Sequence, residues 1–171
     1  MKELNKKHIE AVIKLINNSP YFSLLSINVC TIEYGYCKIE VSLEEKHLNP
    51  FGGLHGGVYS SAIDTAAYWA VYGSVDEDTG LISIDLHVDN ISSVQKGKLI
   101  VEGKQIKAGR TICFSEGIIK DEDGKLLAHG ISKLLVTNNL QTINHAAMAM
   151  GYEALPVKFI MKKNNIMDIE E

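Results

Sequence analysis

The chain has 171 residues, of which 46% are hydrophobic, and this fits a single domain with a substantial core and a terminal appendage. Its formal net charge of -4 at pH 7 argues against non-specific nucleic-acid binding, so we expect no nucleic-acid partner. The N-terminus lacks a continuous apolar run, which predicts neither a signal peptide nor a membrane span, and therefore a cytoplasmic protein with no membrane partner. The 3 cysteines and 6 histidines form no close pair with metal-ligand spacing, so no metal site is predicted.

The N-terminal third predicts one helix followed by two strands. Apolar residues at helical spacing favour an amphipathic packing helix from about Lys2 to Asn18. The apolar connector 21–26 has no clear pattern, and residues 27–34 predict a strand. Strict alternation from Tyr36 to Leu43 predicts a half-buried antiparallel strand.

The chain is organised around the stretch from His55 to Tyr72, which follows a loop rich in turn formers from Glu44 to Leu54. Its apolar residues recur at helical spacing, and its many alanines would let a sheet approach the backbone closely. The stretch therefore predicts one long buried helix. Its inward faces consist of Val58, Ala62, Ala66 and Trp69, continued by Ile63, Ala67, Ala70 and Val71.

Asp64 is the only charged residue of this helix. On a helical wheel it lies in a stripe of small hydroxyl and tyrosine side chains, namely Ser60, Ser61, Thr65, Tyr68 and Tyr72. The stripe could face solvent, but a solvated helix face usually carries lysine, glutamate or arginine. A subunit interface or a pocket fits these residues better, and we favour the pocket.

The start of the helix offers hydrogen-bond donors. The glycines Gly56 and Gly57 allow another group to approach the backbone, and the first N–H groups of a helix have no intrahelical partner. These donors suit an oxyanion or a polarised carbonyl. Asp64 lies about 12 Å further along the axis, so one carbonyl cannot reach both. If the two act together, they come from two protomers, which predicts a dimer with sites at its seam.

Four more strands are predicted after the helix, followed by a segment without a clear pattern. The strands span residues 81–89, 98–107, 110–120 and 126–137. The predicted strands are interrupted only once by a helix, so the chain shows no βαβ alternation. This pattern predicts the α+β fold class, with an antiparallel sheet wrapped around a long central helix. Residues 138–171 are interpreted as a C-terminal extension packed on the domain or on a partner subunit.

The loop and helix together carry a recognisable motif, His47-x-Asn49-x-x-Gly52-x-x-His55-Gly56-Gly57 followed by Asp64. With this motif the chain resembles the hotdog-fold thioesterases, in particular the phenylacetate-pathway type (PaaI-like) branch of the 4-hydroxybenzoyl-CoA thioesterase superfamily. The segments 80–86 and 107–111 match in kind and order, and the resemblance covers roughly residues 27–137. It implies a hotdog domain over residues 1–137, with the N-terminal helix included.

The resemblance also implies an activity. An acyl-CoA thioesterase of this type is a homodimer or a dimer of dimers and needs no cofactor, because CoA is part of the substrate. The aromatic residues Tyr68, Trp69 and Tyr72 of this chain could line a pocket for an aromatic or medium-chain acyl group, although aromatics near the C-terminal end of a helix are more often core. The backbone N–H at Gly56 polarises the thioester carbonyl, and Asp64 of the facing protomer acts as general base or nucleophile. Asn49 and Ser83 help to place the water or the carboxylate.

The remaining candidate residues have less distinctive patterns. We interpret His55 as a structural hydrogen-bonding residue of the site rather than as a base, because the motif pairs it with no serine or cysteine nucleophile. For the CoA part of the substrate the sequence offers Gly57, Arg110, Thr111 and Lys133, since arginine suits bidentate phosphate contacts.

Two other functions stay open at this stage. A related hotdog enoyl thioester hydratase is disfavoured. In the pattern of such enzymes an Asp or Glu is paired with a histidine at a short spacing, whereas in this chain Trp69 stands five residues after Asp64. A non-catalytic acyl-CoA sensor would bind its ligand and leave it intact. Release of free thiol separates hydrolysis from both alternatives.

Overall fold

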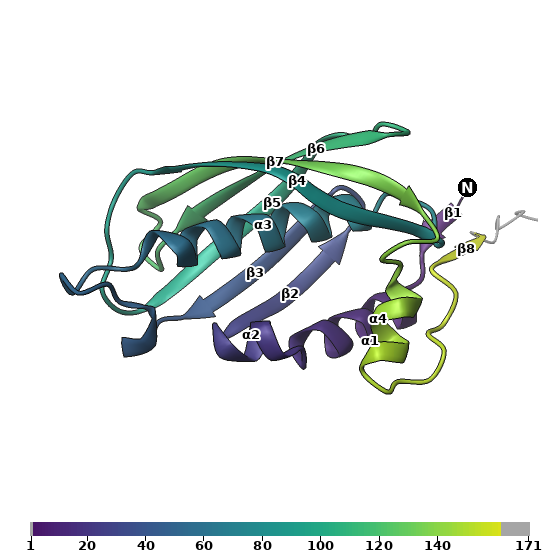
Figure 1. Cartoon of the computed structure of the whole chain (residues 1–171), viewed down its shortest axis with the longest axis horizontal. Coiled ribbons are helices and arrows are strands. Elements are labelled where there is room, and N and C mark those ends of the chain that lie inside the picture. Colours follow the sequence, from purple (N-terminus) through teal and green to yellow (C-terminus); the bar gives the residue numbers. More distant parts are fainter. Residues whose placement is uncertain (1, 162–171) are drawn as a thin grey trace, which may run out of the picture.

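The computed structural model describes residues 2–161, in which an antiparallel sheet curves around one long helix (Figure 1). The helices are α1 (Lys6–Asn17), α2 (Pro20–Leu24), α3 (Gly56–Tyr72) and α4 (Ile143–Ala149), with a short 3-10 turn at Glu45–His47. The strands are β1 (Lys2–Leu4), β2 (Ile27–Glu33), β3 (Tyr36–Ser42), β4 (Thr79–Asn90), β5 (Lys98–Lys107), β6 (Ile112–Lys120), β7 (Leu126–Asn138) and β8 (Phe159–Met161).

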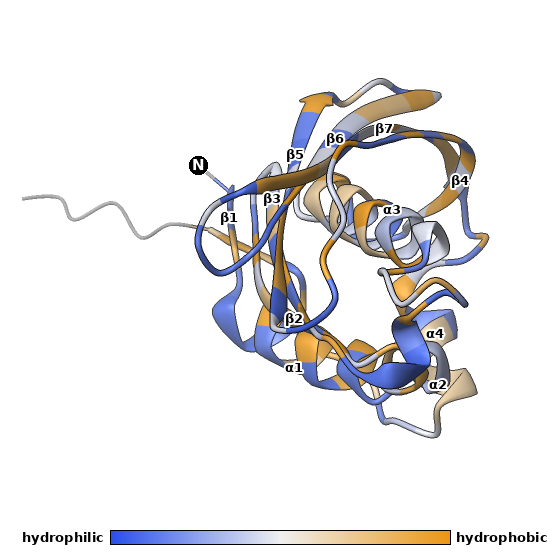
Figure 2. Cartoon of the chain, turned by 90° about the vertical axis from the view of Figure 1, so that its left-hand side faces the viewer, coloured by the Kyte–Doolittle hydropathy of each residue, from blue (hydrophilic) through white to orange (hydrophobic). Residues whose placement is uncertain are grey.

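The main sheet has the strand order β2-β3-β5-β6-β7-β4, and every neighbouring pair is antiparallel. Figure 2 looks along α3 and shows it lying in the concave side of this sheet. The arrangement confirms the predicted α+β fold class, with the sheet wrapped around the central helix. One edge of the sheet is β2, where the Asn17 side chain of α1 donates to Val29 O at 3.1 Å and accepts from Val29 N at 2.8 Å. The other edge is β4.

A row of glycines in three adjacent strands brings the sheet very close to α3. Gly103 of β5, Gly117 of β6 and Gly130 of β7 face one another in register. A Cβ atom on Gly103 would lie 2.1 Å from the carbonyl oxygen of Ala66, and one on Gly117 would lie 2.9 Å from Ile63. Both predicted inward faces of α3 are buried. The helix packs closely on the sheet because alanine has a small side chain and glycine has none.

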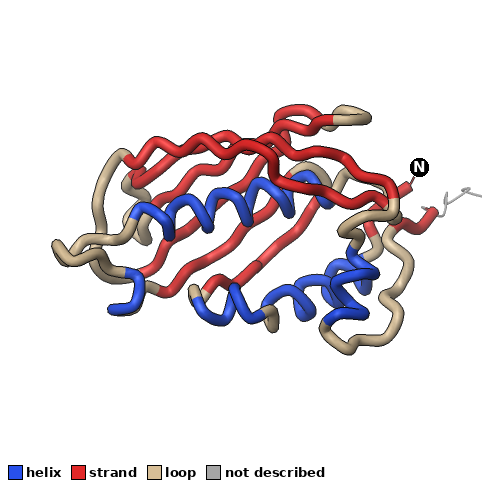
Figure 3. Tube along the Cα trace, in the orientation of Figure 1, coloured by secondary structure: helices blue, strands red, loops and turns tan. Residues whose placement is uncertain are grey.

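One prediction for the N-terminal region was wrong in detail, and one segment for which no structure was predicted is assigned by the structure. The predicted helix from Lys2 begins only at Lys6, because residues 2–4 instead pair as β1 with β8, near the end of the described chain. The connector 21–26 is mostly helical, since Pro20 at the first position of α2 has a backbone angle suited to a helix start. Figure 3 shows both short segments, β1 as a strand and α2 as a helix.

The segment after β7 folds back onto the domain. Ile143 and Ala147 of α4 belong to the buried core, and Figures 1 and 2 both place α4 beside α1. Lys158 is completely buried, and its backbone oxygen accepts from Asn5 N at 2.9 Å. The boundary predicted near residue 137 stays a prediction, and residues 162–171 of the predicted extension lie outside the described residues. None of the helices in residues 2–161 is both long and apolar enough to cross a membrane.

Candidate active site

Asp64 lies half-buried in the middle of α3, where two serine hydroxyls from the sheet approach its carboxylate. The hydroxyl of Ser83 on β4 donates to Asp64 Oδ1 at 2.8 Å, and that of Ser132 on β7 lies 3.5 Å from the same oxygen. A carboxylate that accepts such hydrogen bonds is fixed in position while its second oxygen stays available. The structure therefore brings two of the predicted site residues, Asp64 and Ser83, into contact.

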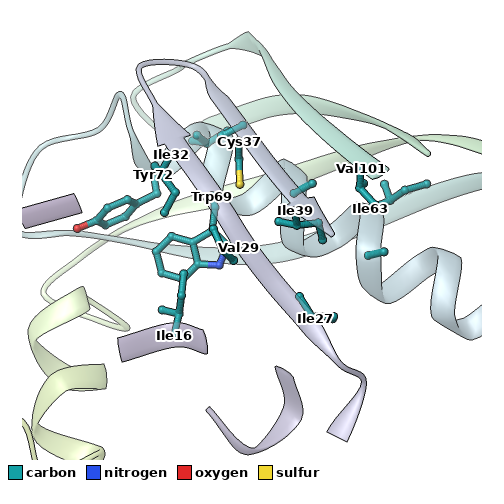
Figure 4. Close-up of a cluster of buried hydrophobic side chains, with 14 of the residues drawn as sticks. Ile16, Ile27, Val29, Ile32, Cys37, Ile39, Ile63, Trp69, Tyr72 and Val101 are labelled. Carbon is teal, nitrogen blue, oxygen red and sulfur yellow. The ribbon is translucent and has the colours of Figure 1, made fainter. Parts of the chain in front are cut away.

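A cavity of about 290 Å³ adjoins Asp64, and we call it the Asp64 cavity. Its α3 wall consists of Asp64, Thr65, Tyr68, Trp69 and Tyr72, so most of the predicted polar stripe lines a pocket. Figure 4 shows the indole of Trp69 directed toward Ile16 of α1, which lines the same cavity. Burial, together with the nearby Asp64 carboxylate, raises the pKa of Tyr68 to about 12. Tyr68 is therefore a neutral phenol near pH 7.

The start of α3 presents a backbone donor. The imidazole Nδ1 of His55 accepts from Gly57 N at 2.9 Å and so caps the helix, and Val58 N donates to His55 O. Within residues 2–161 the Gly56 N–H donates to no protein acceptor. A second cavity of about 370 Å³ adjoins Gly56, and we call it the Gly56 cavity. It can hold a group that accepts from this N–H.

The loop before α3 is built to hold this donor in place. Asn49 accepts from Phe51 N at 2.9 Å and also lines the Gly56 cavity, together with Asn90 of β4. His47 is buried and links the loop to the end of α2 and to the start of α3, since it accepts from Glu44 N, its Nε2 lies 3.0 Å from Leu25 O, and its backbone oxygen accepts from His55 N. These contacts make His47 a structural residue.

The two cavities lie at different points along the same helix. Eight residues of helical rise separate Gly56 from Asp64, about 12 Å. Among the described residues the two cavities share no lining side chain. One chain therefore does not bring the donor and the carboxylate to a single carbonyl, in agreement with the helix geometry expected from the sequence.

The residues predicted to bind the CoA part of the substrate are not brought together within one chain. The Gly57 N–H is used by the His55 cap, and the Lys133 ammonium forms an ion pair with Asp85 at 2.6 Å. Arg110 and Thr111 are exposed in the connection before β6, so the predicted strand start at residue 110 was two residues too early. Their contact with CoA stays a prediction.

Sequence reasoning missed two residues that the fold places at these cavities. Ser132 reaches Asp64 from 68 positions away, and Asn90 approaches Gly56, where its Nδ2 would lie 3.0 Å from a Cβ. Neither residue belongs to the motif around His55. The only signal for Ser132 is a small polar residue within an apolar strand, which is also common in strands without function.

Comparison with known proteins identifies the class of protein to which the chain belongs. Residues 51–128, which include Gly56, Asp64, Ser83 and Asn90, match the sequence profile of the thioesterase superfamily. A Saccharolobus solfataricus protein that is provisionally named an esterase is 31% identical over 125 residues, which cover 73% of this chain and 87% of that protein. The 1,4-dihydroxy-2-naphthoyl-CoA hydrolase of Listeria monocytogenes is 28% identical over 103 residues, 60% of this chain and 84% of that enzyme.

A solved structure shows the same fold. A thioesterase from Haemophilus influenzae superposes with a TM-score of 0.70 at 26% identity, covering 78% of this chain and 92% of that one. The chain belongs to the thioesterase superfamily. It is a thioester hydrolase with the hotdog fold.

Proposed function

We propose that the protein hydrolyses an acyl-CoA to the free acid and CoA, at sites formed between two copies of the chain. The observation that carries the proposal is the Asp64 carboxylate, which a serine hydroxyl fixes at 2.8 Å beside a cavity. The CoA part of the substrate is supported by the Listeria monocytogenes relative, whose name describes hydrolysis of 1,4-dihydroxy-2-naphthoyl-CoA.

The dimer is supported by the free edge of the sheet. The β2 edge is covered by α1, whereas β4 pairs only with β7 within the described chain. β4 also exposes apolar side chains, with Ile84 51% accessible, and Ser83 on this strand contacts Asp64. A second copy that pairs along β4 through a two-fold axis would place its own α3 near Asp64. Such a dimer has two equivalent sites, and a further pairing of dimers is compatible with it.

In this mechanism each chemical role falls to one group. The Gly56 N–H of one protomer donates to the thioester oxygen and stabilises the negative charge that develops there. Asp64 of the other protomer takes a proton from water, the water oxygen bonds to the carbonyl carbon, and the carbon–sulfur bond then breaks. The proton returns from Asp64 to the departing thiolate. Direct attack by Asp64 on the carbon would give the same products after a second step with water.

The test is the release of CoA from phenylacetyl, benzoyl, hexanoyl, palmitoyl and malonyl thioesters, detected chromatographically so that the protein's own thiols do not interfere. We expect Asp64→Asn to lower kcat about 100-fold or more while binding is kept. Asp121→Asn, in the turn after β6, is the matched control and should keep native activity. Tight binding of intact acyl-CoA without turnover would instead support the sensor, and hydration of an enoyl thioester without thiol release would support the hydratase.

A further inference from the structure

The Asp64 cavity has a wall that comes from outside the superfamily match. Besides α3, α1 and α2, it is lined by Gln141, Thr142, Ile143, Ala146 and Met150. These residues form the start, one face and the end cap of α4, whereas the family match ends at residue 128. The chain after β7 therefore contributes one side of the cavity that adjoins Asp64.

Only one face of α4 lines the cavity. Ile143, Ala146 and Met150 recur at spacings of three and four, which places them on one side of a helix. The side chain of Met148 points to the opposite side and is 67% accessible, and Ala149, the last residue of α4, is also exposed and does not line the cavity. Substitutions on the two faces can therefore separate effects on the cavity from effects on the helix.

The segment that carries α4 is fixed at both ends. At its start, Leu140 O accepts from the Thr137 hydroxyl and lies so close to Gly80 that a Cβ there would be 1.6 Å away. This contact tolerates only glycine, which ties the segment to the start of β4.

At the other end, the buried Lys158 ammonium donates to Tyr72 O at 2.7 Å and to Val75 O at 2.8 Å, and it lies 3.7 Å from the centroid of the Tyr72 ring. His8 donates to Pro156 O and accepts from the Tyr72 hydroxyl at 2.6 Å. Because Tyr72 itself lines the Asp64 cavity, these contacts fix both the segment and the cavity wall.

The size and charge of the cavity define what fits. A cavity of about 150 Å³ holds benzene, so the 290 Å³ of the Asp64 cavity suits an aromatic ring with a short linker or a chain of medium length. Among the described residues 2–161, Asp64 is the only charged one in its lining. An acyl group with its own carboxylate would thus meet a negative charge and no cation, which is unfavourable at such a site.

We propose that α4 is the specificity wall of the acyl pocket, where Ile143, Ala146 and Met150 limit the substrate to neutral acyl groups of aromatic or medium-chain size. This proposal rests on the proposed acyl-CoA hydrolysis and adds the residues that select the acyl group. The helix that selects the acyl group in this proposal, α4, lies outside the superfamily match.

The first experiment reduces the cavity. Ala146→Phe fills it, whereas Ala149→Phe adds the same side chain at an exposed position at the end of α4 that does not line the cavity. With acetyl, butyryl, hexanoyl, octanoyl, dodecanoyl and phenylacetyl thioesters of CoA, we expect Ala146→Phe to lower kcat/KM at least tenfold for hexanoyl and longer chains and for phenylacetyl. Acetyl-CoA hydrolysis and all activities of Ala149→Phe should stay within twofold of native. Equal profiles for the two variants would overturn the proposal.

The second experiment enlarges the cavity and keeps the proposal testable if Ala146→Phe is unstable. Met150→Ala should shift the preferred chain length upward by two or more carbons, while the exposed control Met148→Ala keeps the native preference. Succinyl-CoA should be hydrolysed at least tenfold less well than butyryl-CoA by the native protein. An unchanged chain-length preference in Met150→Ala, or efficient hydrolysis of succinyl-CoA, contradicts the assignment.

The same panel separates the two proposals. If the native protein hydrolyses none of these thioesters, the proposed acyl-CoA hydrolysis fails, and the specificity wall fails with it. If the native protein is active but its preference does not respond to residues 146 and 150, only the specificity wall is rejected.

Discussion

The two cavities along α3 differ in the way they are built. The Gly56 cavity is formed by a loop, the first turn of α3 and the end of β4, and its key group is a backbone N–H. The Asp64 cavity is formed by helices on three sides, and its key group is a side-chain carboxylate. A donor from the backbone persists through most substitutions, whereas the carboxylate and the apolar wall depend on particular side chains.

This difference indicates how the work is divided in a dimer. In the proposed dimer each chain carries the donor half of one site and the base half of the other, and only the base half is combined with the proposed acyl pocket. The proposal therefore assigns selection among substrates to the Asp64 half and polarisation of the carbonyl to the Gly56 half.

The division predicts complementation between two inactive chains. Gly56→Pro removes the donor N–H, and proline is tolerated at a first helical position, where His55 already has the extended backbone that precedes proline (φ -69, ψ 133). We expect Gly56→Pro and Asp64→Asn each to lose about 100-fold or more in kcat. A heterodimer purified through two different tags has one intact site of two and should recover about half of native activity.

The matched control for this experiment is the heterodimer of Asp64→Asn with the native chain, which should also show about half of native activity. If the doubly defective heterodimer stays inactive while this control is active and both have native thermal unfolding, donor and carboxylate act within one chain. Full activity of Gly56→Pro homodimers would exclude the Gly56 N–H as the donor.

The glycine row predicts a strong stability effect near the Asp64 half. In Gly103→Ala the new Cβ would lie 2.1 Å from Ala66 O, so α3 must move away from β5, at a cost of roughly 1–3 kcal/mol in the free energy of unfolding. Urea unfolding measures this change. Gly57→Ala at the other end of α3 is the comparison, since its Cβ meets only the His55 side chain and should change stability by less than about 0.5 kcal/mol. Equal effects at both glycines would contradict the close helix–sheet contact.

The two serines at Asp64 should differ in their effect on turnover. The Ser83 hydroxyl lies 2.8 Å from the carboxylate and the Ser132 hydroxyl 3.5 Å, so Ser83 makes the stronger contact. We expect Ser83→Ala to lower kcat about tenfold with little change in KM, and Ser132→Ala to have a smaller effect on kcat. Steady-state kinetics with phenylacetyl-CoA measures both. A larger loss in Ser132→Ala would assign the positioning role to β7 instead.

The contact that fixes the far end of the Asp64 cavity should make stability depend on pH. Burial lowers the pKa of Lys158 to about 7, against the opposing charges of Glu77 and Asp76. Between pH 7 and the ordinary lysine pKa near 10.4, the unfolded chain binds a proton that the folded chain does not, so stability rises with pH. From pH 7 to 8.5 we expect a gain on the order of 1 kcal/mol in the free energy of unfolding.

The variant Lys158→Met should flatten this rise, which thermal unfolding across the range measures. His8, whose pKa burial also lowers, contributes only below its ordinary value near 6.5, because only there does the unfolded chain bind the extra proton. Above about pH 8.5 the buried thiols, whose pKa values are raised, act in the opposite direction. A native profile that is as flat as that of the variant would show that the Lys158 ammonium does not titrate in this range.

Much of the fold follows from local patterns in the chain. The alternation in β3 and β4 and the helical spacing in α3 predict their type, because side-chain period reflects which face is buried. The N-terminal strand β1 was missed, because three residues without alternation become a strand only when β8 pairs with them. The contact of Asp64 with Ser83 was suggested through the family motif alone, since 19 positions separate the two residues.

The sequence by itself determined the long helix, its single charge, and the glycines at its start that leave backbone donors accessible. It also determined that donor and carboxylate are too far apart on one helix, because helical rise is fixed by covalent geometry and hydrogen bonding. Only the tertiary structure decided that α4 closes the Asp64 cavity, that Lys158 is buried against Tyr72, and that Gly103, Gly117 and Gly130 meet in one row. These contacts join residues far apart in the chain, and their partners are set by strand register and packing, which no local periodicity encodes.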